Sequence, residues 1–317
     1  MFTAELAAQG GTDIVHIHHL SGLSLGIPTI AQAAGARVVL TLHDPWLLCA
    51  RGQLIDRLGD QCVGPDVSRC ARCVADAVWA PVPFAHRLPP RTRPIRLRNA
   101  HVSTALAAVD LLHAPSRHLA ARFSGAEVIP LPLLRAVPPA GDAGNGPLRF
   151  LFLGALIPTK GADIALDAFS RLPKGISTLT VAGPVLAYNG STRWGQQLVA
   201  RASVTHGVRF VGSVEHTEVP DLLEASDVLL FPSRWIENSP FVLREATAAG
   251  LRVISSAGPA TDELAPAARR VHGAAVEGWE RAMREEVAVG RGRLLPRPWP
   301  SMTDHAQAMV ERYRALR

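Results

Sequence analysis

The sequence predicts an α/β protein of two Rossmann-like, doubly wound domains that face each other across a cleft. Two observations predict this class. The chain has 317 residues, enough for roughly two domains of about 150 residues each. Short apolar runs of strand length alternate along it with amphipathic stretches of helix length, which is typical of parallel βαβ units. Because ligands bind beyond the carboxyl ends of the strands in such sheets, we expect the site residues to follow the strands.

The second half of the chain shows this alternation most clearly. Its apolar runs predict five strands, at residues 149–155, 178–182, 208–212, 227–232 and 252–256. The stretches between the strands predict helices at residues 161–172, 192–205, 218–225 and 239–249. Strands joined by helical crossovers form a parallel sheet that is covered by helices on both faces.

The first half repeats the pattern more briefly, after a helix-like opening stretch. Its strands are expected at residues 13–18, 37–42, 111–114 and 127–129. A doubly wound domain usually has about six strands, so this domain is short of strands. Its first edge, rich in Val and Ile, is left open, which favours pairing with another chain. Either the reading frame is truncated, or a partner chain or a second copy of this chain covers that edge.

Composition indicates the domain boundaries. Residues 130–147 hold five prolines and three glycines, which is typical of an interdomain linker. Apolar residues at helical spacing near the C-terminus predict a final helix that braces both domains. The expected organisation is an incomplete amino-terminal domain over residues 1–130, a linker over residues 131–147, a second Rossmann-like domain over residues 148–298 and the C-terminal helix over residues 299–317.

Composition also excludes several classes of protein. With 48% hydrophobic and 19% charged residues, the chain is neither disordered nor collagen-like. No apolar stretch reaches the 18 or so uncharged residues of a membrane-spanning helix, and the first ten residues lack the features of a secretion signal. We therefore expect a cytoplasmic protein.

The charge balance is basic. The net charge is +6, and 31 of the 33 basic residues are arginine, which favours phosphate-bearing partners. The densest cluster is interleaved with proline and comprises Arg87, Arg91, Arg93, Arg96 and Arg98. Three interpretations are a solvated loop, a contact with a membrane or another anionic acceptor, and a nucleic-acid contact. Since no zinc finger, stacking platform or recognition helix accompanies the charge, no nucleic-acid partner is expected.

The strongest chemical signal is the segment FPSRWIENSPFVLRE at residues 231–245. A strand is expected to end where it starts, and Ser239 and Pro240 are expected to open a helix as its cap and first residue. Backbone amides without partners at a helix start form an anion site. Glu245 lies further along this helix among apolar residues, where an ionised carboxylate is costly unless it accepts hydrogen bonds, for example from ligand hydroxyls. The alternative is that Glu237 is a dipole-stabilised carboxylate and Glu245 a surface one.

The two glutamates belong to an ordered pattern. Glu237 and Glu245 are separated by seven residues and are followed by ATAAG and VIS. This arrangement resembles the paired-Glu motif of the retaining glycosyltransferases of family 4, within glycosyl transferases group 1. The segment FLFLGALIPTKG at residues 150–161 is similar to the strand, glycine and lysine that open the family's donor-binding domain, and ASDVLLFPS at residues 225–233 resembles the strand before the Glu pair. The resemblance covers nearly all of residues 11–264 and implies the two-domain GT-B fold.

The resemblance also implies a nucleoside-diphosphate-sugar donor and a role for each matching residue. Glu245 would hold the ribose hydroxyls, Glu237 would approach the transferred sugar, and Lys160 would neutralise the diphosphate. The other donor-binding residues that it implies are Gly154, Ser239, Pro240, Phe241 and Val242. Because an ammonium and helix-start amides already stabilise the charge that grows on the leaving diphosphate, neither a metal nor another cofactor is expected for catalysis.

One position departs from the family pattern. Family members commonly carry an arginine directly after the glycine that matches Gly154, and here Ala155 follows it. One cation for the diphosphate is therefore missing. Either Arg234 or another arginine substitutes for it, or the donor binds more weakly.

In the first half, the second expected strand leads into His43 and Asp44. The resemblance implies that His43, in the acceptor-side domain, contacts the sugar or the acceptor and is a third catalytic residue. The alternative is a hydrogen-bonded histidine at a strand end. Asp44 is expected to cap the following turn. His16 and His18, on one face of the first strand by alternation, and the neighbouring His19 allow metal binding, sheet packing or a lining for the acceptor.

All four cysteines fall within one irregular loop, residues 49–73, and they are Cys49, Cys62, Cys70 and Cys73. Four thiolates can close a tetrahedral zinc site, but separations of twelve and seven residues match no standard zinc ribbon. Three states are open: a structural zinc ion, disulfides and free thiols. In either bound form the cluster would pin the loop after His43, which is expected to border the acceptor pocket.

The sequence thus predicts a metal-independent retaining glycosyltransferase that acts on a glycan, a lipid-linked or a small-molecule acceptor, as in polysaccharide biosynthesis. The basic cluster suggests that the protein is peripheral to the inner face of the membrane. The alternative function is an incomplete or auxiliary subunit that binds a nucleotide-sugar without turning it over. The short first domain favours it, since nothing upstream of Asp13 corresponds to the family's early glycine-rich loop.

Overall fold

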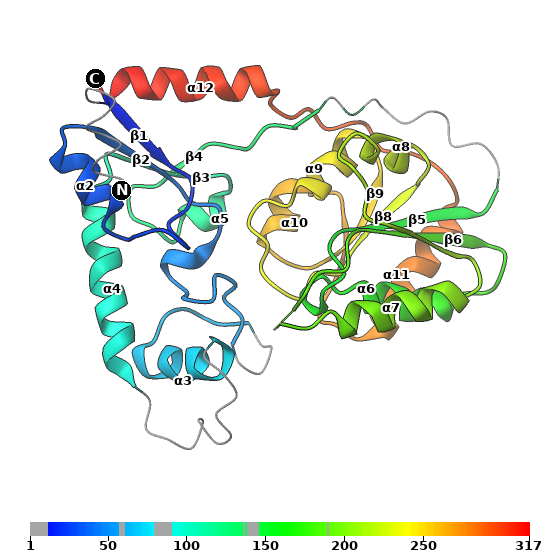
Figure 1. Cartoon of the computed structure of the whole chain (residues 1–317). Coiled ribbons are helices and arrows are strands. Elements are labelled where there is room, and N and C mark those ends of the chain that lie inside the picture. The colour runs from blue at the N-terminus through cyan, green and yellow to red at the C-terminus, as the bar shows by residue number, and fades with distance from the viewer. Residues whose placement is uncertain (1–11, 57–60, 79–90, 136, 138–145, 189) are drawn as a thin grey trace. The chain divides into compact units, whose positions relative to one another are not determined.

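The structure, a computed structural model, describes residues 12–56, 61–78, 91–135, 137, 146–188 and 190–317 (Figure 1). The chain divides into two compact units. The first combines residues 1–131 with residues 303–317, and the second covers residues 132–302. Each unit contains a wholly parallel sheet with helices packed on it. The predicted class of two α/β domains, each with a parallel sheet and helices, is confirmed. The helix-like opening stretch lies outside the described residues.

The second unit is built on a six-stranded sheet in the order β10-β9-β8-β5-β6-β7. Its strands are β5 (Leu148–Leu153), β6 (Ser177–Ala182), β7 (Val208–Gly212), β8 (Val228–Phe231), β9 (Arg252–Ser256) and β10 (Arg269–Val271). The five predicted strands are present, and β10 is an additional strand at the edge. β5 pairs with both β6 and β8, so the strand order reverses there. In doubly wound sheets the ligand crevice opens at the carboxyl ends of the strands at this reversal.

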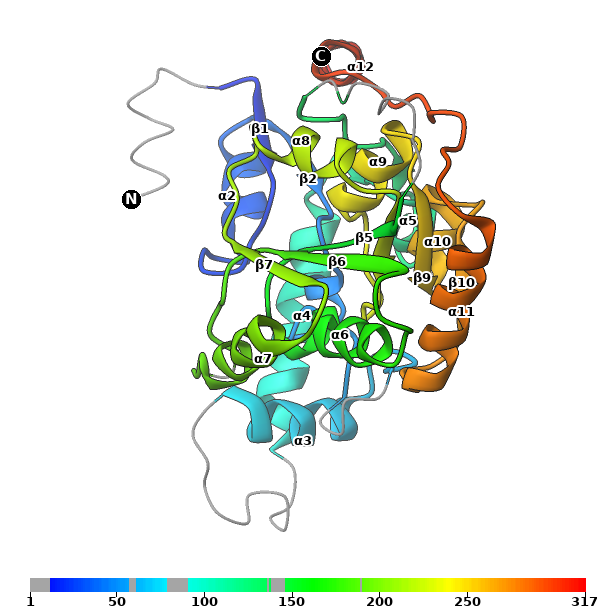
Figure 2. The same cartoon turned by 90° about the vertical axis from the view of Figure 1, so that its right-hand side faces the viewer.

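Helices cover both faces of this sheet; Figure 2 shows α6 and α7 below it and α8 and α9 above it. The helices are α6 (Ala162–Ser170), α7 (Arg193–Val204), α8 (Val219–Glu224), α9 (Phe241–Ala248), α10 (Pro259–Leu264) and α11 (Val276–Val289). Alternate residues of β8 point to opposite faces. Val228 and Leu230 join the core around Trp279, whereas Leu229 joins the core around Leu243. Burial on both faces explains why these strands read as continuous apolar runs.

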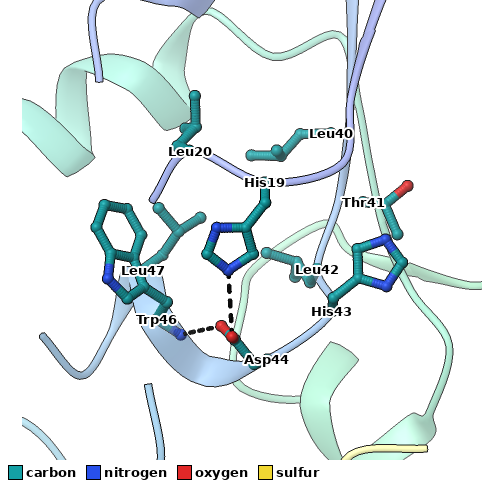
Figure 3. A pocket seen from close by; sticks show the side chains of 9 residues that line it. All are labelled: His19, Leu20, Leu40, Thr41, Leu42, His43, Asp44, Trp46 and Leu47. Atoms are coloured by element: carbon teal, nitrogen blue, oxygen red, sulfur yellow. Dashed lines mark hydrogen bonds and ion pairs between the residues drawn. The ribbon is translucent and has the colours of Figure 1, made fainter. Parts of the chain in front are cut away.

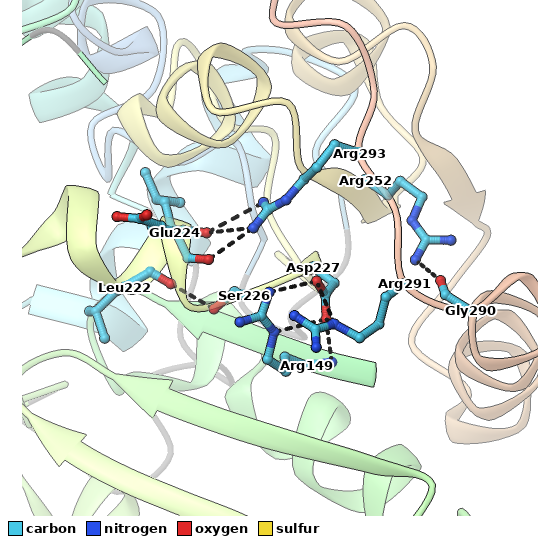
Figure 4. A network of polar contacts seen from close by, with 10 residues as sticks. Arg149, Leu222, Glu224, Ser226, Asp227, Arg252, Gly290, Arg291 and Arg293 are labelled. Carbon is cyan, nitrogen blue, oxygen red and sulfur yellow. Dashed lines mark hydrogen bonds and ion pairs between the residues drawn. The ribbon is translucent and has the colours of Figure 1, made fainter. Parts of the chain in front are cut away.

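A polar network stabilises the edge of this sheet where the strands begin, opposite the edge where their carboxyl ends lie (Figure 4). Asp227, directly before β8, is fully buried. It accepts hydrogen bonds from the backbone amide, Nε and Nη2 of Arg149 at 2.9, 3.0 and 2.8 Å, and Nε of Arg291 lies 3.3 Å from its Oδ2. Burial raises the pKa of Asp227, but the hydrogen bonds and charges of the two arginines outweigh burial and lower the pKa overall. The carboxylate therefore joins β5, β8 and the segment after α11 as an ionised group.

The first unit contains a four-stranded sheet in the order β1-β2-β3-β4. Its strands are β1 (Ile14–Ile17), β2 (Arg37–Thr41), β3 (Leu111–Ala114) and β4 (Glu127–Val128). Its helical elements are α2 (Ile27–Ala33), η1 (Pro45–Leu47), α3 (Val67–Val78), α4 (Thr92–Ala107), α5 (Arg117–Ala120) and α12 (Met302–Ala315). Among the described residues β1 pairs only with β2, so the predicted open edge is present in that part of the chain.

The C-terminal helix α12 packs on the sheet of the first unit. Leu40 belongs to the core on one face of this sheet. On the other face Val39 and Leu111 pack with Met309 of α12, and Tyr313 lies against the same cluster. The predicted C-terminal helix is therefore confirmed. Its expected role as a brace between the two domains stays a prediction.

The interpretation of the arginine cluster as a loop is wrong. Arg93, Arg96 and Arg98 lie in α4, and Arg91 is its N-cap residue. The helix forms because its buried residues, which include Ile95, recur at helical spacing and face the core. The proline of this segment falls in the first helical turn, where its missing N–H costs no hydrogen bond. Arg87 lies outside the described residues. No helix in the part of the chain that the structure describes is both long and apolar enough to cross a bilayer.

Candidate functional site

Two loops meet at the carboxyl edge of the second unit's sheet. The loop after β5 contains the short helix η3 (Pro158–Lys160), and the loop after β8 runs over residues 232–240. Arg234 ties the loops together, since its amide and its Nη1 donate to two carbonyls of η3 at 2.8 and 2.5 Å. This junction brings Lys160 next to Glu237, as the sequence predicts for two residues of one site.

Lys160 and Glu237 form an ion pair with 2.5 Å between Nζ and Oε1. The same carboxylate oxygen accepts hydrogen bonds from Ser233 Oγ at 2.9 Å and from Trp235 Nε1 at 2.5 Å. The Glu237 residue is only 9% exposed, and the ammonium lies 5.1 Å from the centre of the Trp235 ring. A buried carboxylate is therefore oriented by one cation and two neutral donors. The sequence analysis missed Ser233 and Trp235, although both lie in the loop that it singled out.

Glu245 lies on α9 and lines a small hollow. The other lining residues are Leu134, Arg135, Val137, His216, Val219 and Pro220. Burial raises the pKa of Glu245, and the charges of His216 and Arg244 oppose that shift. Within the described part of the chain, the carboxylate has no hydrogen bond or ion pair. It is thus a partly desolvated acceptor that faces a hollow and can receive hydroxyl groups from a ligand.

The start of α9 differs from the predicted cap. The N-cap residue is Pro240 instead of Ser239, and no side chain caps this end of the helix. The Oγ of Ser239 instead accepts a hydrogen bond from Nη2 of Arg244. The first amides of the helix, at Phe241 and Val242, therefore have no side-chain acceptor and can bind an anion.

Gly154 directly follows β5, where the backbone is tightly packed. Its amide donates to the carbonyl of β6's last residue at 3.0 Å, and a Cβ on Gly183 would lie 2.0 Å from its carbonyl oxygen. Ala155 brings no charge to this edge. Arg234 does not supply one freely either, because its guanidinium binds both carboxylate oxygens of Asp163 at 2.8 and 2.7 Å.

In the first unit, His43 lies just beyond the end of β2, in a row of histidines. Its Nε2 lies 3.2 Å from Nδ1 of His18, and the two rings stack with centroids 5.4 Å apart. Burial lowers the pKa of His43, as do the charges of His18 and His19, while Asp44 opposes the shift. The imidazole is therefore neutral at pH 7 and can donate or accept a hydrogen bond.

His19 and Asp44 close a small pocket beside His43 (Figure 3). Nε2 of His19 lies 3.1 Å from Oδ2 of Asp44, and Nδ1 of His19 accepts from the amide of Ser21 at 2.8 Å. These partners place the imidazole proton on Nε2. Asp44 Oδ1 also accepts from the amide of Trp46 at 2.7 Å and caps η1, so the predicted capping role is confirmed.

The metal-binding interpretation of the first-strand histidines is wrong. Both ring nitrogens of His16 have protein partners, at 2.5 Å to the hydroxyl of Tyr313 and at 2.7 Å to that of Thr41. The hydroxyl of Thr41 also lies 2.8 Å from Nε2 of the buried His113, so the hydrogen bonds link His16 to His113. Among the described residues no group of His, Cys, Asp or Glu is placed to hold a metal ion. These histidines pack the carboxyl end of the sheet and join it to α12.

The four cysteines are free thiols, so the disulfide interpretation is wrong for this structure. A structural zinc ion stays a prediction, and within the described ranges no group of His, Cys, Asp or Glu is placed to hold a metal ion. The sulfur atoms have other partners, because Cys62 donates to the carbonyl of Gly64 at 3.3 Å and Cys73 accepts from Arg51 at 3.6 Å. Burial raises the pKa of Cys70, and so do the other three cysteines. A thiol with a raised pKa is less ready to bind a metal, because only the thiolate binds.

Comparisons with known sequences point to one family. Residues 138–278 match the family described as Glycosyl transferases group 1. Glycogen synthase of Mycobacterium tuberculosis is 34% identical over 114 residues, which are 35% of this chain and 26% of that protein. D-inositol 3-phosphate glycosyltransferase of Mycobacterium bovis is 32% identical over 110 residues, which are 33% of this chain and 22% of that protein. The chain therefore matches about a quarter of the length of these curated relatives.

Solved structures are similar over nearly the whole chain. Sucrose-phosphate synthase from Thermosynechococcus elongatus has a TM-score of 0.63 at 17% identity and covers 99% of this chain and 76% of that one. Alr3699/HepE of Anabaena, in complex with UDP and glucose, has a TM-score of 0.64 at 14% identity. The similarity covers 99% of this chain and 81% of that one. The catalytic domain of starch synthase IV from Arabidopsis thaliana, bound to ADP and acarbose, has a TM-score of 0.60 at 13% identity and covers 99% and 75%.

These structural neighbours are GT-B glycosyltransferases, so the predicted GT-B fold is confirmed. The family match spans the loops that carry Lys160 and Glu237. Residues 138–278 are thus similar to glycosyl transferases group 1, and the whole described chain is similar in fold to GT-B glycosyltransferases.

Proposed function

We propose that this chain is a retaining glycosyltransferase of family 4 that moves a sugar from a nucleoside-diphosphate sugar to a hydroxyl acceptor without a metal. The family match supports a glycosyltransferase enzyme. The observation that carries the proposal is the 2.5 Å ion pair between Lys160 and Glu237, in loops that precede α6 and α9 at the reversal of the strand order. A cation, a buried carboxylate and uncapped amides suit an anionic sugar donor.

Lys160 would stabilise the leaving group. As the bond between the anomeric carbon and the diphosphate oxygen breaks, negative charge grows on that oxygen. An ammonium and the amides of Phe241 and Val242, already in place before the reaction, stabilise this charge as it forms. In the free protein Glu237 neutralises the ammonium. A bound diphosphate would share it, and Ser233 and Trp235 would keep the Glu237 carboxylate oriented toward the transferred sugar.

Glu245 would recognise the other end of the donor. Its carboxylate lines a hollow and has no hydrogen bond or ion pair in the described part of the chain, which suits two adjacent ribose hydroxyls. Gly154, with Ser239 and Pro240, would provide the close backbone approach to the donor. His43, neutral at pH 7 because burial lowers its pKa, would contact the sugar or the acceptor.

The donor is proposed from the chemistry of the site and from the ligands of similar proteins. UDP and glucose are bound to Alr3699/HepE, and ADP and acarbose are bound to the catalytic domain of starch synthase IV. UDP- and ADP-sugars are therefore the first donors to test, with GDP-sugars beside them. Glycans, lipid-linked sugars and small molecules are the acceptor classes, and the two relatives named above favour a carbohydrate or polyol hydroxyl.

The test is an assay of donor hydrolysis and sugar transfer with wild type, Lys160→Ala, Glu237→Gln and Glu245→Gln. Each variant is expected to lose at least about tenfold in kcat/KM, as removal of a positioned transition-state contact does. Lys174→Ala and Glu311→Gln are matched controls at exposed positions and should keep wild-type rates. The anomeric configuration of the product, read by nuclear magnetic resonance, tests the retaining mechanism, and a chelator tests metal independence.

Two outcomes would contradict this proposal. Equal rates in all variants would show that these residues have no part in the reaction. Binding of a nucleotide-sugar without hydrolysis or transfer, with every acceptor class, would favour the auxiliary binding subunit instead.

A peripheral membrane contact is a second part of the proposal, and α4 carries it. Arg91, Arg93 and Arg96 are exposed at the start of this helix, and its first turn has no acidic residue. Cations are unfavourable there because the helix dipole already places positive charge at that end. Leu97, 56% exposed, lies on the same helical face as Arg93. Anionic lipid headgroups would compensate the charge and the interface would accept the leucine.

Flotation with phosphatidylglycerol vesicles tests this contact. Arg93→Glu/Arg96→Glu is expected to abolish binding and, because acidic residues suit a helix start, to leave the fold intact. Arg209→Glu, an exposed arginine of the second unit, is the control and should still bind. Equal flotation of all three proteins, or equal binding to neutral phosphatidylcholine vesicles, would refute the contact.

A further inference from the structure

The second unit buries one arginine completely. Arg244, the fourth residue of α9, has no exposed surface and is among the largest fully buried side chains of the described residues. Its guanidinium contacts two aromatic rings: Cζ lies 5.6 Å from the centre of the Phe241 ring and 5.5 Å from that of the Trp299 ring. Burial lowers the pKa of Arg244 to about 10, so the group is still a cation at pH 7.

This cation has little polar compensation in the free protein. Nη2 donates to Ser239 Oγ, and Nε and Nη1 have no hydrogen-bond partner. Glu263 and Glu245 act on its pKa through their charges, but neither forms an ion pair with it. Lys160 and Arg234 of the same edge each have a carboxylate in contact. Arg244 is therefore the cation of this edge that lacks a contacting counter-ion among the described residues.

The position of Arg244 makes its buried charge more destabilising for the folded protein. A buried cation without a counter-ion is strongly disfavoured, and a cation near the start of a helix opposes the helix dipole. Both penalties fall when an anion binds at the same helix end. The hydrogen bond to Ser239 shows that the guanidinium is directed toward that end, where the amides of Phe241 and Val242 have no side-chain acceptor.

We propose that Arg244 is a positioning residue for the diphosphate of the donor, which it serves through Ser239 and through its buried charge behind the start of α9. This inference rests on the proposed function, because the anion it invokes is the donor's diphosphate. Arg244 would supply the positive charge that Ala155 does not provide and that Arg234 shares with Asp163. Bound diphosphate would in turn compensate the buried guanidinium.

A purely structural role makes the opposite prediction. If Arg244 only holds Trp299 and Phe241 in place, its replacement should lower stability and leave ligand affinity per folded molecule unchanged. If its charge serves the ligand, an apolar side chain of similar length should leave stability equal or higher, because the desolvation penalty disappears. The same substitution should weaken the binding of diphosphates. The two roles therefore differ in both measurements: a structural role lowers stability and leaves affinity unchanged, whereas a role in ligand binding lowers affinity and leaves stability equal or higher.

The experiment compares Arg244→Met and Arg244→Lys with wild type by calorimetric titration and urea denaturation of the full chain. The probes are UDP, ADP, inorganic pyrophosphate and the matching nucleosides. Arg244→Met is expected to bind the diphosphates and pyrophosphate at least about tenfold more weakly, to bind nucleosides as wild type does, and to keep or raise its urea midpoint. Arg244→Lys should recover part of the lost affinity. Arg193→Met, in α7, is the matched control.

Wild-type-like pyrophosphate affinity in Arg244→Met, or a lower urea midpoint with unchanged affinity, would overturn the inference. Because the readout is binding, it is separate from catalysis. Diphosphate binding that depends on Arg244 in a protein without transferase activity would refute the proposed function and keep the inference. Active wild type together with a fully active Arg244→Met variant would support the proposed function and refute the inference about Arg244.

Discussion

A Cβ atom on Gly161 would lie 2.0 Å from the carbonyl oxygen of Pro232. Gly161 follows η3 with a φ of +73°, a conformation that side chains rarely adopt. The loops after β5 and β8 can therefore touch only because this residue has no side chain. Their contact places Lys160 within 2.5 Å of Glu237. The geometry of the proposed site thus depends on a backbone approach between segments about 70 residues apart in the chain.

Gly161→Ala should separate the two loops and displace Lys160 from Glu237. Positive φ costs an alanine about 1–2 kcal/mol, and the clash adds roughly 1–3 kcal/mol, so the urea midpoint should fall. Transferase activity should fall further, by about a hundredfold, because a displacement of about 1 Å at a site has that effect. The control is Gly175→Ala, which shares the strain at φ +84° but meets nothing within 4 Å. Equal loss of activity in both variants would contradict the argument.

The row of histidines at the carboxyl end of the first unit's sheet should make that unit sensitive to acid. Burial lowers the pKa of His16 to about 4 and that of His113 to about 3; His118, on α5, is lowered to about 4. Their unfolded-state pKa is about 6.5. Between these values the unfolded chain binds protons that the folded chain does not, so the free energy of unfolding falls as the pH falls.

The expected slope is up to about 1.4 kcal/mol per pH unit for each of these histidines. Urea denaturation at about pH 7, pH 6 and pH 5, above the range of most carboxyl groups, measures it. His113→Gln retains a polar partner for Thr41 but cannot titrate, so its slope should be shallower than that of wild type. The exposed His272→Gln controls for the substitution itself. Stability that is constant or rises toward pH 5 would refute the prediction.

The sequence was sufficient for the architecture of the second unit because its strands are buried on both faces. Phe150 of β5, for example, pairs with Val228 of β8, and both side chains lie in the same core. Strands that are buried on both faces are apolar throughout. β10 was not predictable in the same way. Two of its three residues are arginines, whose charges are satisfied by distant carboxylates, Glu286 and Asp262. Locally this segment reads as a polar loop, and only tertiary contacts make it a strand.

The candidate site was predictable in part for a related reason. Lys160 and Glu237 stood out because each closes a motif at a strand end, and the structure brings them together. Trp235 and Ser233 did not, because their donation to Glu237 depends on how the loop turns. Arg244 gave no signal either, since an arginine on a short helix is usually exposed, and its burial requires Trp299 from a distant segment.

Glu245 and Arg244 are neighbours in the sequence but should affect different parts of the donor. Glu245→Gln is expected to weaken the binding of a nucleoside by about tenfold or more, because a charged acceptor of hydroxyl groups is replaced by a neutral amide. Its affinity for inorganic pyrophosphate should be that of wild type. Calorimetric titration of both ligands measures the difference. Weaker pyrophosphate binding with unchanged nucleoside binding would place Glu245 at the wrong end of the donor.

Asp227 should be the residue on which the amino-terminal edge of the second unit's sheet depends most. It is fully buried and holds Arg149 through three hydrogen bonds. Asp227→Asn removes the buried counter-charge of two partly buried guanidinium groups, so it should lower the free energy of unfolding by several kcal/mol, on the order of the cost of breaking a buried ion pair (about 3–5 kcal/mol). The matched control is Glu277→Gln, whose ion pair with Arg171 is exposed and therefore contributes little to stability. Urea denaturation of both variants tests the difference.

The network of Asp227 lies at the opposite edge of the sheet from Lys160 and Glu237. The folded fraction of Asp227→Asn should therefore bind nucleoside diphosphates like wild type. Weaker binding by correctly folded protein would show that the two edges are coupled.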